Sequence, residues 1–358
     1  MGRQFRKLDQ LMLSVGDKEA SYNAGPGGWL AASAIQLFEF SEAYAVWDDK
    51  LRSDRDSVHG SQFATTDEIV RQDVRLAYTE RQVRPAHLGG LLALAGGVVA
   101  TVQDGALVAY RHKFTPVAAD VALPSIAMME KASGEQFLCK GIKLDSLALA
   151  RGGSENAYWS LEAGLIGSGH RASDATAFVT KLTEAPLRWG DAKCWLETGT
   201  DISIDAAPTQ GLENISSGTP DVLTLRLKGA RFSVGNALQA DEGYEPASGK
   251  VRGRLDHGDD RRFRIELTVE VDPSTLATER GYYDNRDNVA VELEVDSGTI
   301  IAATGVYKYG FDLIIPRLRL EPIARSVDRG VALVTFAGEC MYDGTNPLWN
   351  GYEYTAYA

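Results

Sequence analysis

The chain has 358 residues, of which 44% are hydrophobic and 24% charged, a composition that excludes a disordered or fibrous protein. Its length allows two domains of common size, each with its own core. The formal net charge of −12 argues against a protein that grips nucleic acid, because that binding depends on clustered Lys and Arg that displace counterions from phosphates.

The beginning of the chain predicts neither export nor a membrane anchor. Asp9 and Gln10 interrupt the basic start before an apolar stretch of signal-peptide length appears, and Arg6 stands where a myristoylation motif needs Ser or Thr. The most apolar stretch, residues 88–102, contains four glycines and is shorter than the ~20 residues that cross a bilayer. We therefore expect no export and no membrane contact.

One helix is predicted at about 85–96. Pro85 suits the first helical turn, and Gly96 with Gly97 ends the helix. Between them runs an apolar stripe at helical spacing: Leu88, Leu91, Leu92 and Ala95. Residues 173–185 allow either a second, weaker helix or an irregular linker.

The strand at residues 142–153 changes its apolar face in the middle. Ile142 and Leu144 lie at even positions, whereas Leu147 and Leu149 lie at odd ones, so the alternation slips at Asp145. The same slip recurs in residues 318–330, at Glu321 and Pro322. Because proline donates no ladder hydrogen bond and is tolerated at a bulge, we expect a β-bulge at each place.

Two later segments alternate as half-buried strands. Residues 263–271 place Phe263, Ile265, Leu267, Val269 and Val271 inside and charged residues outside. In residues 288–298 the valines and Leu293 are expected inside, with Glu292, Glu294 and Asp296 outside and a turn at Asp-Ser-Gly.

The chain repeats itself. Residues 142–169 can be aligned with residues 318–344, and the preceding strands of each half match more loosely. We therefore predict a duplication, with a first β module at 1–175 and a second, similar module at 176–358. A long polar loop follows the first strand of each module, at residues 48–62 and 236–260.

The sequence carries no motif for catalysis or metal binding. It has no P-loop and no Gly-x-Ser-x-Gly nucleophile motif. The five histidines are isolated from one another, and the three cysteines form no CxxC pair. We therefore expect no enzymatic activity, no catalytic residue, no metal site and no cofactor, and we expect free thiols.

Several signals within residues 85–153 occur in an order that resembles the major tail tube protein family of long-tailed bacteriophages. They are the helix with its glycine stop, His112 and Phe114 on one strand, Leu-Pro-Ser at 123–125, Cys139 and Gly141 at a strand start, and the slipped strand after them. The rest of the chain resembles the family only by its strand pattern.

This resemblance implies a mainly β fold of tandem tail-tube-type β-sandwich or half-barrel modules, each with bulged strands and at least one flanking helix. It also implies a structural virion protein, made in the host cytoplasm, that self-assembles into stacked rings forming the phage tail tube. Genomic DNA would pass through without specific binding, and tape measure and tail terminator or tip proteins would be partners. Three two-module chains would complete a pseudo-sixfold ring; a hexamer remains open if one half alone lines the channel.

An acidic channel would let DNA slide, because duplex DNA carries one negative charge per ~1.7 Å of its axis. Arg262 and Arg264 share the outward faces with the candidates and would moderate that field. The candidate lining residues are Asp73, Arg75, Glu266, Glu270, Glu292 and Glu294.

A second interpretation is a β-sandwich recognition module that binds carbohydrate or acts as a tail-tip adhesion protein. It rests on the aromatic C-terminal segment, which contains Tyr342, Trp349, Tyr352, Tyr354 and Tyr357. These aromatic side chains are equally suited to strands and subunit interfaces.

Overall fold

The structure is a computed structural model. It describes residues 4–15, 18–22, 24, 36–38, 40–55, 64–103, 109–118, 120–151, 157–179, 183–198, 202–205, 208–216, 221–239, 244, 251–258, 260–272, 276–284, 288–301 and 307–356. Within them, no helix is long and apolar enough to span a membrane.

The fold is mainly β, as the alternating patterns predict, and its strands pair antiparallel. The helical elements are α1 (Pro85–Ala95), the short 3-10 helix η1 (Trp189–Asp191) and α2 (Leu276–Asp284). The strands are β1 (Gln4–Lys7), β2 (Gln10–Leu13), β3 (Gln36–Phe38), β4 (Glu42–Arg55), β5 (Ala64–Glu80), β6 (Val98–Gln103), β7 (Tyr110–Phe114), β8 (Ile126–Ala132), β9 (Glu135–Arg151), β10 (Trp159–Gly167), β11 (Arg171–Ser173), β12 (Lys193–Thr198), β13 (Ser203–Ile204), β14 (Ile215–Ser216), β15 (Asp221–Val222), β16 (Leu227–Gly235), β17 (Arg262–Glu270), β18 (Val289–Ile300), β19 (Lys308–Leu320), β20 (Ala324–Asp328), β21 (Val331–Cys340) and β22 (Asn350–Thr355).

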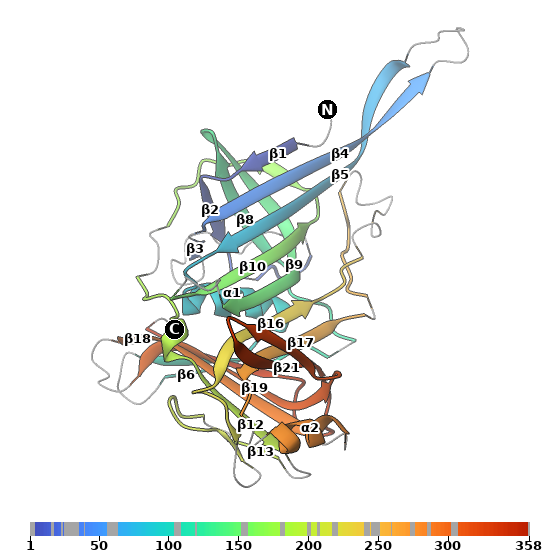
Figure 1. The fold of residues 1–358 in the computed structure, drawn as a ribbon. Coiled ribbons are helices and arrows are strands. Elements are labelled where there is room, and N and C mark those ends of the chain that lie inside the picture. The colour runs from blue at the N-terminus through green and yellow to red at the C-terminus, as the bar shows by residue number, and fades with distance from the viewer. Residues whose placement is uncertain are drawn as a thin grey trace.

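One continuous sheet runs through both halves of the chain. Its strands follow one another in the order β1, β4, β5, β10, β9, β16, β17, β21. Figure 1 shows them stacked from the upper to the lower part of the molecule. The first-half strands therefore lead directly into the second-half strands, without a break between modules. We call this the long sheet.

A second layer of strands closes each half behind the long sheet. In the first half β2 pairs with β3 and β8, and β8 pairs with the beginning of β9. In the second half β12 pairs with β15 and β18, and β18 pairs with β19. The two halves thus use the same pairing pattern in the same chain order, which supports the predicted duplication. The boundary at 175/176 stays a prediction.

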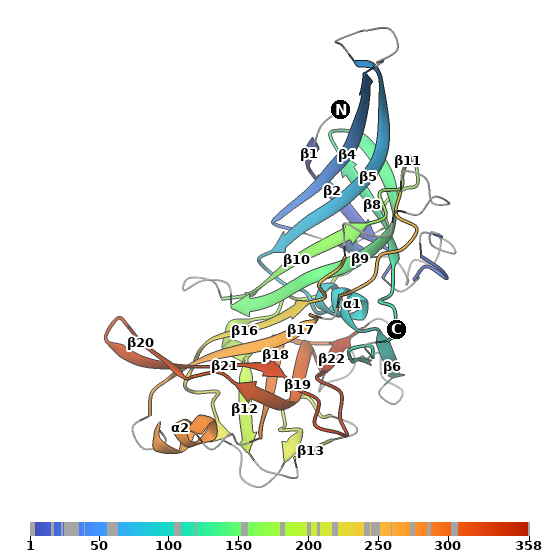
Figure 2. The same cartoon turned by 90° about the vertical axis from the view of Figure 1, so that its right-hand side faces the viewer.

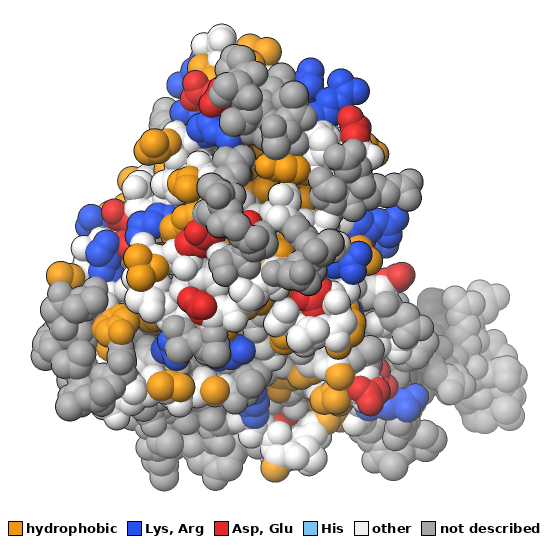
Figure 3. Space-filling view, turned by 90° about the horizontal axis from the view of Figure 1, so that it is seen from below, with side chains coloured by type: hydrophobic (Ala, Val, Ile, Leu, Met, Phe, Trp, Pro, Cys, Tyr) orange, Lys and Arg blue, Asp and Glu red, His pale blue; other side chains and the backbone are white. Residues whose placement is uncertain are grey.

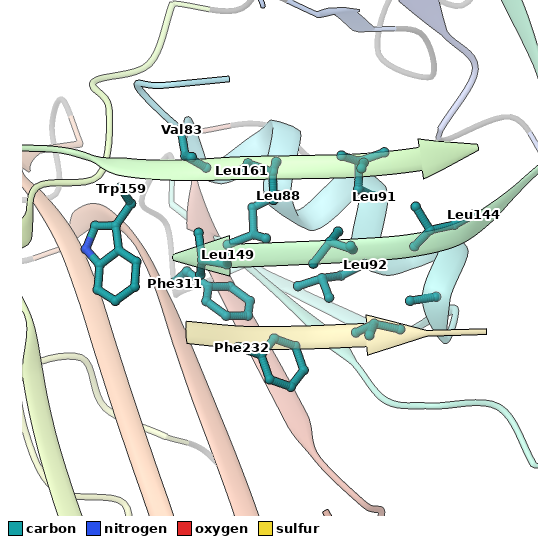
Figure 4. Packing of buried hydrophobic residues seen from close by; sticks show 14 of the residues in the cluster. Val83, Leu88, Leu91, Leu92, Leu144, Leu149, Trp159, Leu161, Phe232 and Phe311 are labelled. Carbon is teal, nitrogen blue, oxygen red and sulfur yellow. The ribbon is translucent and has the colours of Figure 1, made fainter. Parts of the chain in front are cut away.

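The helix α1 fills the centre of the molecule. All eleven of its residues are buried, and Gly96 ends it with a hydrogen bond from its N–H to the Leu92 carbonyl. Figure 4 shows Leu88, Leu91 and Leu92 beside strands of both halves. Leu149 of β9 and Phe232 of β16 belong to the same buried cluster. The predicted helix at about 85–96 is confirmed, and its all-round burial follows from its place between the two halves.

Two residues without side chains allow this close packing. A Cβ atom at Gly89 would collide with the carboxyl group of Glu353 on β22, and one at Gly90 would press on Val15. Because β22 comes from the end of the chain and lies against α1, the helix joins distant parts of the sequence.

The first predicted bulge is confirmed. Ser146 of β9 pairs with Gly164 and Leu144 pairs with Leu165, so Asp145 is an extra residue in the ladder. In the second half the strand is interrupted instead: Leu320 pairs with Gly338 and Ala324 with Thr335, and the residues between them separate β19 from β20. Both halves therefore have an extra residue at this point. In the first half β9 continues through it as one strand, whereas in the second half the strand is divided into β19 and β20.

Three further segments can be compared with the sequence predictions: residues 173–185, α2 and the end of β18. Of the two options for residues 173–185, the described residues follow the irregular linker. The sequence did not predict α2, whose residues carry no clear apolar stripe. The expected turn at Asp-Ser-Gly is wrong, because β18 continues to Ile300 with a register shift around Gly298, whose φ is 70°.

Candidate assembly surface

The two halves meet at a strand seam between β9 and β16. Leu147 pairs with Val234 and Leu149 with Phe232, and all four side chains are buried. The seam ends at the bulge, where the Asp145 carboxylate accepts the Leu238 N–H at 3.0 Å. The Asp145 carbonyl accepts the N–H of Asn236 at 2.7 Å. The bulge therefore turns backbone and side-chain groups of β9 toward the second half and fixes how the halves join.

The outer face of the long sheet is open and carries both small and charged side chains. Ala77, Ser146, Ala150, Ser160, Ser233, Thr268, Thr335 and Ala337 all point to this side at half-buried or exposed positions. Charged side chains of both signs lie among them: Glu42, Arg75, Glu162, Lys228, Arg231, Arg262, Arg264, Glu266, Glu270 and Glu339. The face is mixed in charge rather than acidic.

Three of the candidate lining residues lie on this outer face. Arg75 is exposed. Glu266 forms an ion pair with Arg264 at 3.0 Å, and Glu270 forms one with Lys228 at 2.9 Å. All four paired side chains are half-exposed, so each pair contributes little to stability and mainly neutralises the local field.

The expectation that Asp73 faces outward into open space is wrong. Its position in β5 does point to the outer face, but Tyr244 and Arg252 cover it. Arg252 is fully buried and also donates a hydrogen bond to the Gly167 carbonyl at 2.6 Å. Burial, followed by the hydrogen bond with Asp73, raises the pKa of Tyr244 to about 12. Asp73 is therefore part of a buried ion pair.

The same correction applies to Glu292 and Glu294, which are 0% and 1% exposed. Glu292 accepts hydrogen bonds from the N–H of Asn214 at 2.7 Å and from its side-chain amide at 2.6 Å. Glu294 accepts the N–H of Gly211 at 2.7 Å and lies 3.5 Å from the Lys193 ammonium. The segment at residues 208–216 thus covers the face of β18 that the alternating sequence pattern predicted to be exposed to solvent.

Burial raises the pKa of these carboxyl groups. The pKa of Glu292 is raised to about 7, and that of Glu294 is also raised. Asp312, on the neighbouring strand β19, is fully buried beside Glu292, and burial raises its pKa well above the usual range. Burial therefore favours the neutral form of these carboxyl groups more strongly than an open, solvated strand face would.

The two polar loops differ from the expectation. Residues 48–55 belong to strand β4, which with β5 forms a long hairpin projecting from the body (Figure 2), whereas residues 56–63 lie outside the described part. The described residues of 236–260 contain no named strand and reach back to the first half, where Arg252 and Tyr244 cover Asp73. Nothing in the polar sequence of this loop marked Arg252 as a buried residue.

Most of the described C-terminal aromatic residues lie inside the protein. Trp349, Tyr352 and Tyr354 are at most 2% exposed, and Trp349 packs against Phe232 and Phe263. Tyr342 is exposed, and Tyr357 lies outside the described residues. The buried side chains provide no open aromatic platform for a sugar ring.

Metal-binding side chains do not form a cluster in the described residues. Among them, no cluster of three or more His, Cys, Asp or Glu side chains is arranged to hold a metal ion. A hollow of about 740 Å³ lies between α2 and the end of β19, lined by residues such as Tyr282, Arg319 and Glu339. The cysteines are free thiols, as expected.

The lower end of the molecule, around the second half, shows the same mixture of charges (Figure 3). Basic and acidic side chains are interspersed there with apolar ones.

No protein-family model matches the chain, and no curated protein matches its sequence. The functional argument therefore depends on the geometry of the sheet and its edges.

Proposed function

We propose that this chain is a structural protein that assembles with copies of itself into closed rings, stacked as the tube of a phage tail through which DNA passes. The supporting observation is the seam between β9 and β16. Two similar half-chains are joined there through main-chain pairing into one sheet. A unit that joins its own halves in this way has the geometry to join further units by the same means.

The outer face of the long sheet is suited to line such a channel. Its middle strands carry small side chains, and its charges occur with both signs and in ion pairs. A strongly basic surface would hold the phosphates of DNA. We therefore propose a lining that resists adhesion through small and mutually neutralised side chains, with Arg75, Glu266 and Glu270 on it.

Closure into a ring also removes a hazard of the fold. An exposed sheet edge offers unpaired main-chain groups to any other strand, and closed barrels have no such edge. With two similar halves in each chain, we propose a ring of three chains with pseudo-sixfold symmetry. Proteins that begin, measure and end the tube would be its partners in the virion.

Negative-stain electron microscopy of the purified chain at high concentration tests the proposal. Rotational averages of end-on views are expected to show hollow rings or tubes with three- or sixfold symmetry. Analytical ultracentrifugation over a concentration series is expected to show growing assemblies in the same samples. A chain that stays monomeric at every concentration and salt level tested would overturn the proposal.

The recognition-module alternative predicts a different result. Its protein would remain monomeric and bind glycans on an array. The burial of Trp349, Tyr352 and Tyr354 leaves Tyr342 as the one exposed aromatic side chain among the described members of that segment, which favours the assembly proposal.

A further inference from the structure

The strand β20 has an open edge. One edge pairs with β21, from Ala324 opposite Thr335 to Asp328 opposite Val331. All five β20 residues are exposed, and Val327 is 73% exposed. Within the described part of the chain, no strand pairs with the other edge. Figure 2 shows β20 projecting from the side of the molecule.

The duplicated fold indicates which strand fits that edge. In the first half, the part of β9 beyond the bulge pairs with β16. In the second half, Leu320 corresponds to Leu144, the last paired residue before the bulge. The strand that follows Leu320, and so corresponds to the part of β9 after the bulge, is β20. The counterpart of β16 in the first half is β4, the first strand of the matching hairpin. Repeating the seam between copies therefore pairs β20 of one copy with β4 of the next.

The register of this contact follows from the buried residues of the two hairpins. Ala43, Ala45 and Trp47 face the core on β4 as Ala230, Phe232 and Val234 do on β16. Residues 44–47 thus match residues 231–234, which pair with residues 147–150 of β9. Carried over to β20, this register places Tyr44 of one copy opposite Ser326 of the next.

In the single chain, β1 already occupies this stretch of β4. Gln4 pairs with Trp47 and Lys7 with Tyr44, which are the two ends of the matching stretch. One strand edge accepts only one partner, so β1 and an incoming β20 exclude each other. The chain remains anchored beyond β1, because Leu8 is buried and its N–H bonds to the Ala43 carbonyl at 2.9 Å.

We infer that β1 is a removable cap: it covers the β4 edge in the free chain and gives way to β20 of a second copy when the ring forms. This inference rests on the proposed ring assembly. It adds which strands join neighbouring copies and how β1 prevents that contact in the free chain. The four residue pairs between β1 and β4 are replaced by pairs between β20 and β4. The cap protects the edge from unspecific pairing before assembly.

A cysteine pair tests the contact. In chains carrying both Tyr44→Cys and Ser326→Cys, residues directly opposite on antiparallel strands lie within disulfide reach, so mild oxidation of assembled protein is expected to link different copies. The matched control combines Tyr44→Cys with Thr335→Cys, which lies one strand further in, and is expected to give no link. Rings that form without the Tyr44–Ser326 link would overturn the contact while leaving the proposed function intact.

Removal of residues 2–7 tests the cap. The shortened chain is expected to assemble at a concentration about tenfold lower than the full chain, because β20 no longer competes with β1. Val327→Pro in the full chain is expected to abolish assembly while the monomer keeps its circular dichroism spectrum, since β20 is exposed throughout. An unchanged assembly threshold in the shortened chain would overturn the cap. Failure of every variant and of the full chain to assemble would overturn the proposed function and this inference together.

Discussion

At the scale of single residues, the ion pair between Asp73 and Arg252 is the strongest test of how the two halves hold together. Both side chains are buried, at 5% and 0% exposure, and they come from different halves. Arg252→Met leaves the Asp73 carboxylate buried without its cation. We expect the free energy of unfolding to fall by about 3–5 kcal/mol, measured by urea denaturation.

A surface pair provides the control for this measurement. Arg264→Gln removes the ion pairs with Glu266 and Glu321, whose side chains are about as exposed as that of Arg264. Exposed pairs contribute about 0–1 kcal/mol, so this variant is expected to unfold nearly as the wild type does. Equal losses in the two variants would show that the buried position of Arg252 has no special role.

The buried acids around Glu292 predict a pH dependence. Its folded pKa of about 7 lies above the unfolded value near 4.3, so its contribution to stability is complete below pH ~4 and is lost as the pH rises through about 7. Asp312→Asn removes the neighbouring carboxyl group. The free energy of unfolding of this variant is expected to exceed that of the wild type at pH 8 by on the order of 1 kcal/mol, and to differ less at pH 5.

Glu266→Gln serves as the comparison for the pH series, because Glu266 is half-exposed on the outer face. Its stability curve is expected to run parallel to that of the wild type between pH 5 and 8. If Asp312→Asn also runs parallel, the buried acids do not titrate in this range and the explanation is wrong.

At the scale of elements, the sequence predicted those features that depend on local pattern. The apolar stripe and glycine stop located α1, and the slip at Asp145 located the bulge. It failed for β18, whose alternation of Val and Glu is typical of a half-buried strand. The segment at 208–216 covers the acidic face through contacts such as Asn214 with Glu292, nearly eighty positions apart, which no local pattern contains.

The N-terminal end of α1 depends on a partner that is also distant in sequence. Arg84 provides no side-chain cap, and the N–H of Ala86 instead bonds to the Glu184 carboxyl group at 2.9 Å. Thr355 donates its hydroxyl to the same carboxyl group. Glu184→Ala removes a buried acceptor from the Ala86 N–H and from the Thr355 hydroxyl, so we expect the free energy of unfolding to fall by about 1–2 kcal/mol in urea denaturation.

Glu184→Gln distinguishes hydrogen bonding from charge at this position. Burial raises the pKa of Glu184, and a neutral amide accepts the Ala86 N–H and bonds with the Thr355 hydroxyl. This variant is expected to lose less than half as much stability as Glu184→Ala. Equal losses in the two variants would mean that the negative charge, acting on the helix dipole, is what holds the helix end.

At the scale of the whole molecule, the two halves are interlocked rather than placed side by side. The C-terminal strand β22 lies between β7 of the first half and β19 of the second. The helix α1 contacts β7 and β9 on one side and β19 and β22 on the other. The N–H of Leu187 bonds to the Val83 carbonyl at 2.7 Å, which ties the connecting segment to the same centre. The two halves of the chain thus share one set of paired strands and one central helix.

This interlocking predicts that the fragment 1–175 does not fold alone. Without β22 and β19, α1 and β7 would expose apolar surface that both halves bury together. We expect the full chain to unfold in a single calorimetric transition, the separate fragments 1–175 and 176–358 to show no cooperative melting, and their co-expression to restore it. If fragment 1–175 melts cooperatively near the temperature of the full chain, the halves are independent modules, and their shared sheet is a docking contact rather than part of one core.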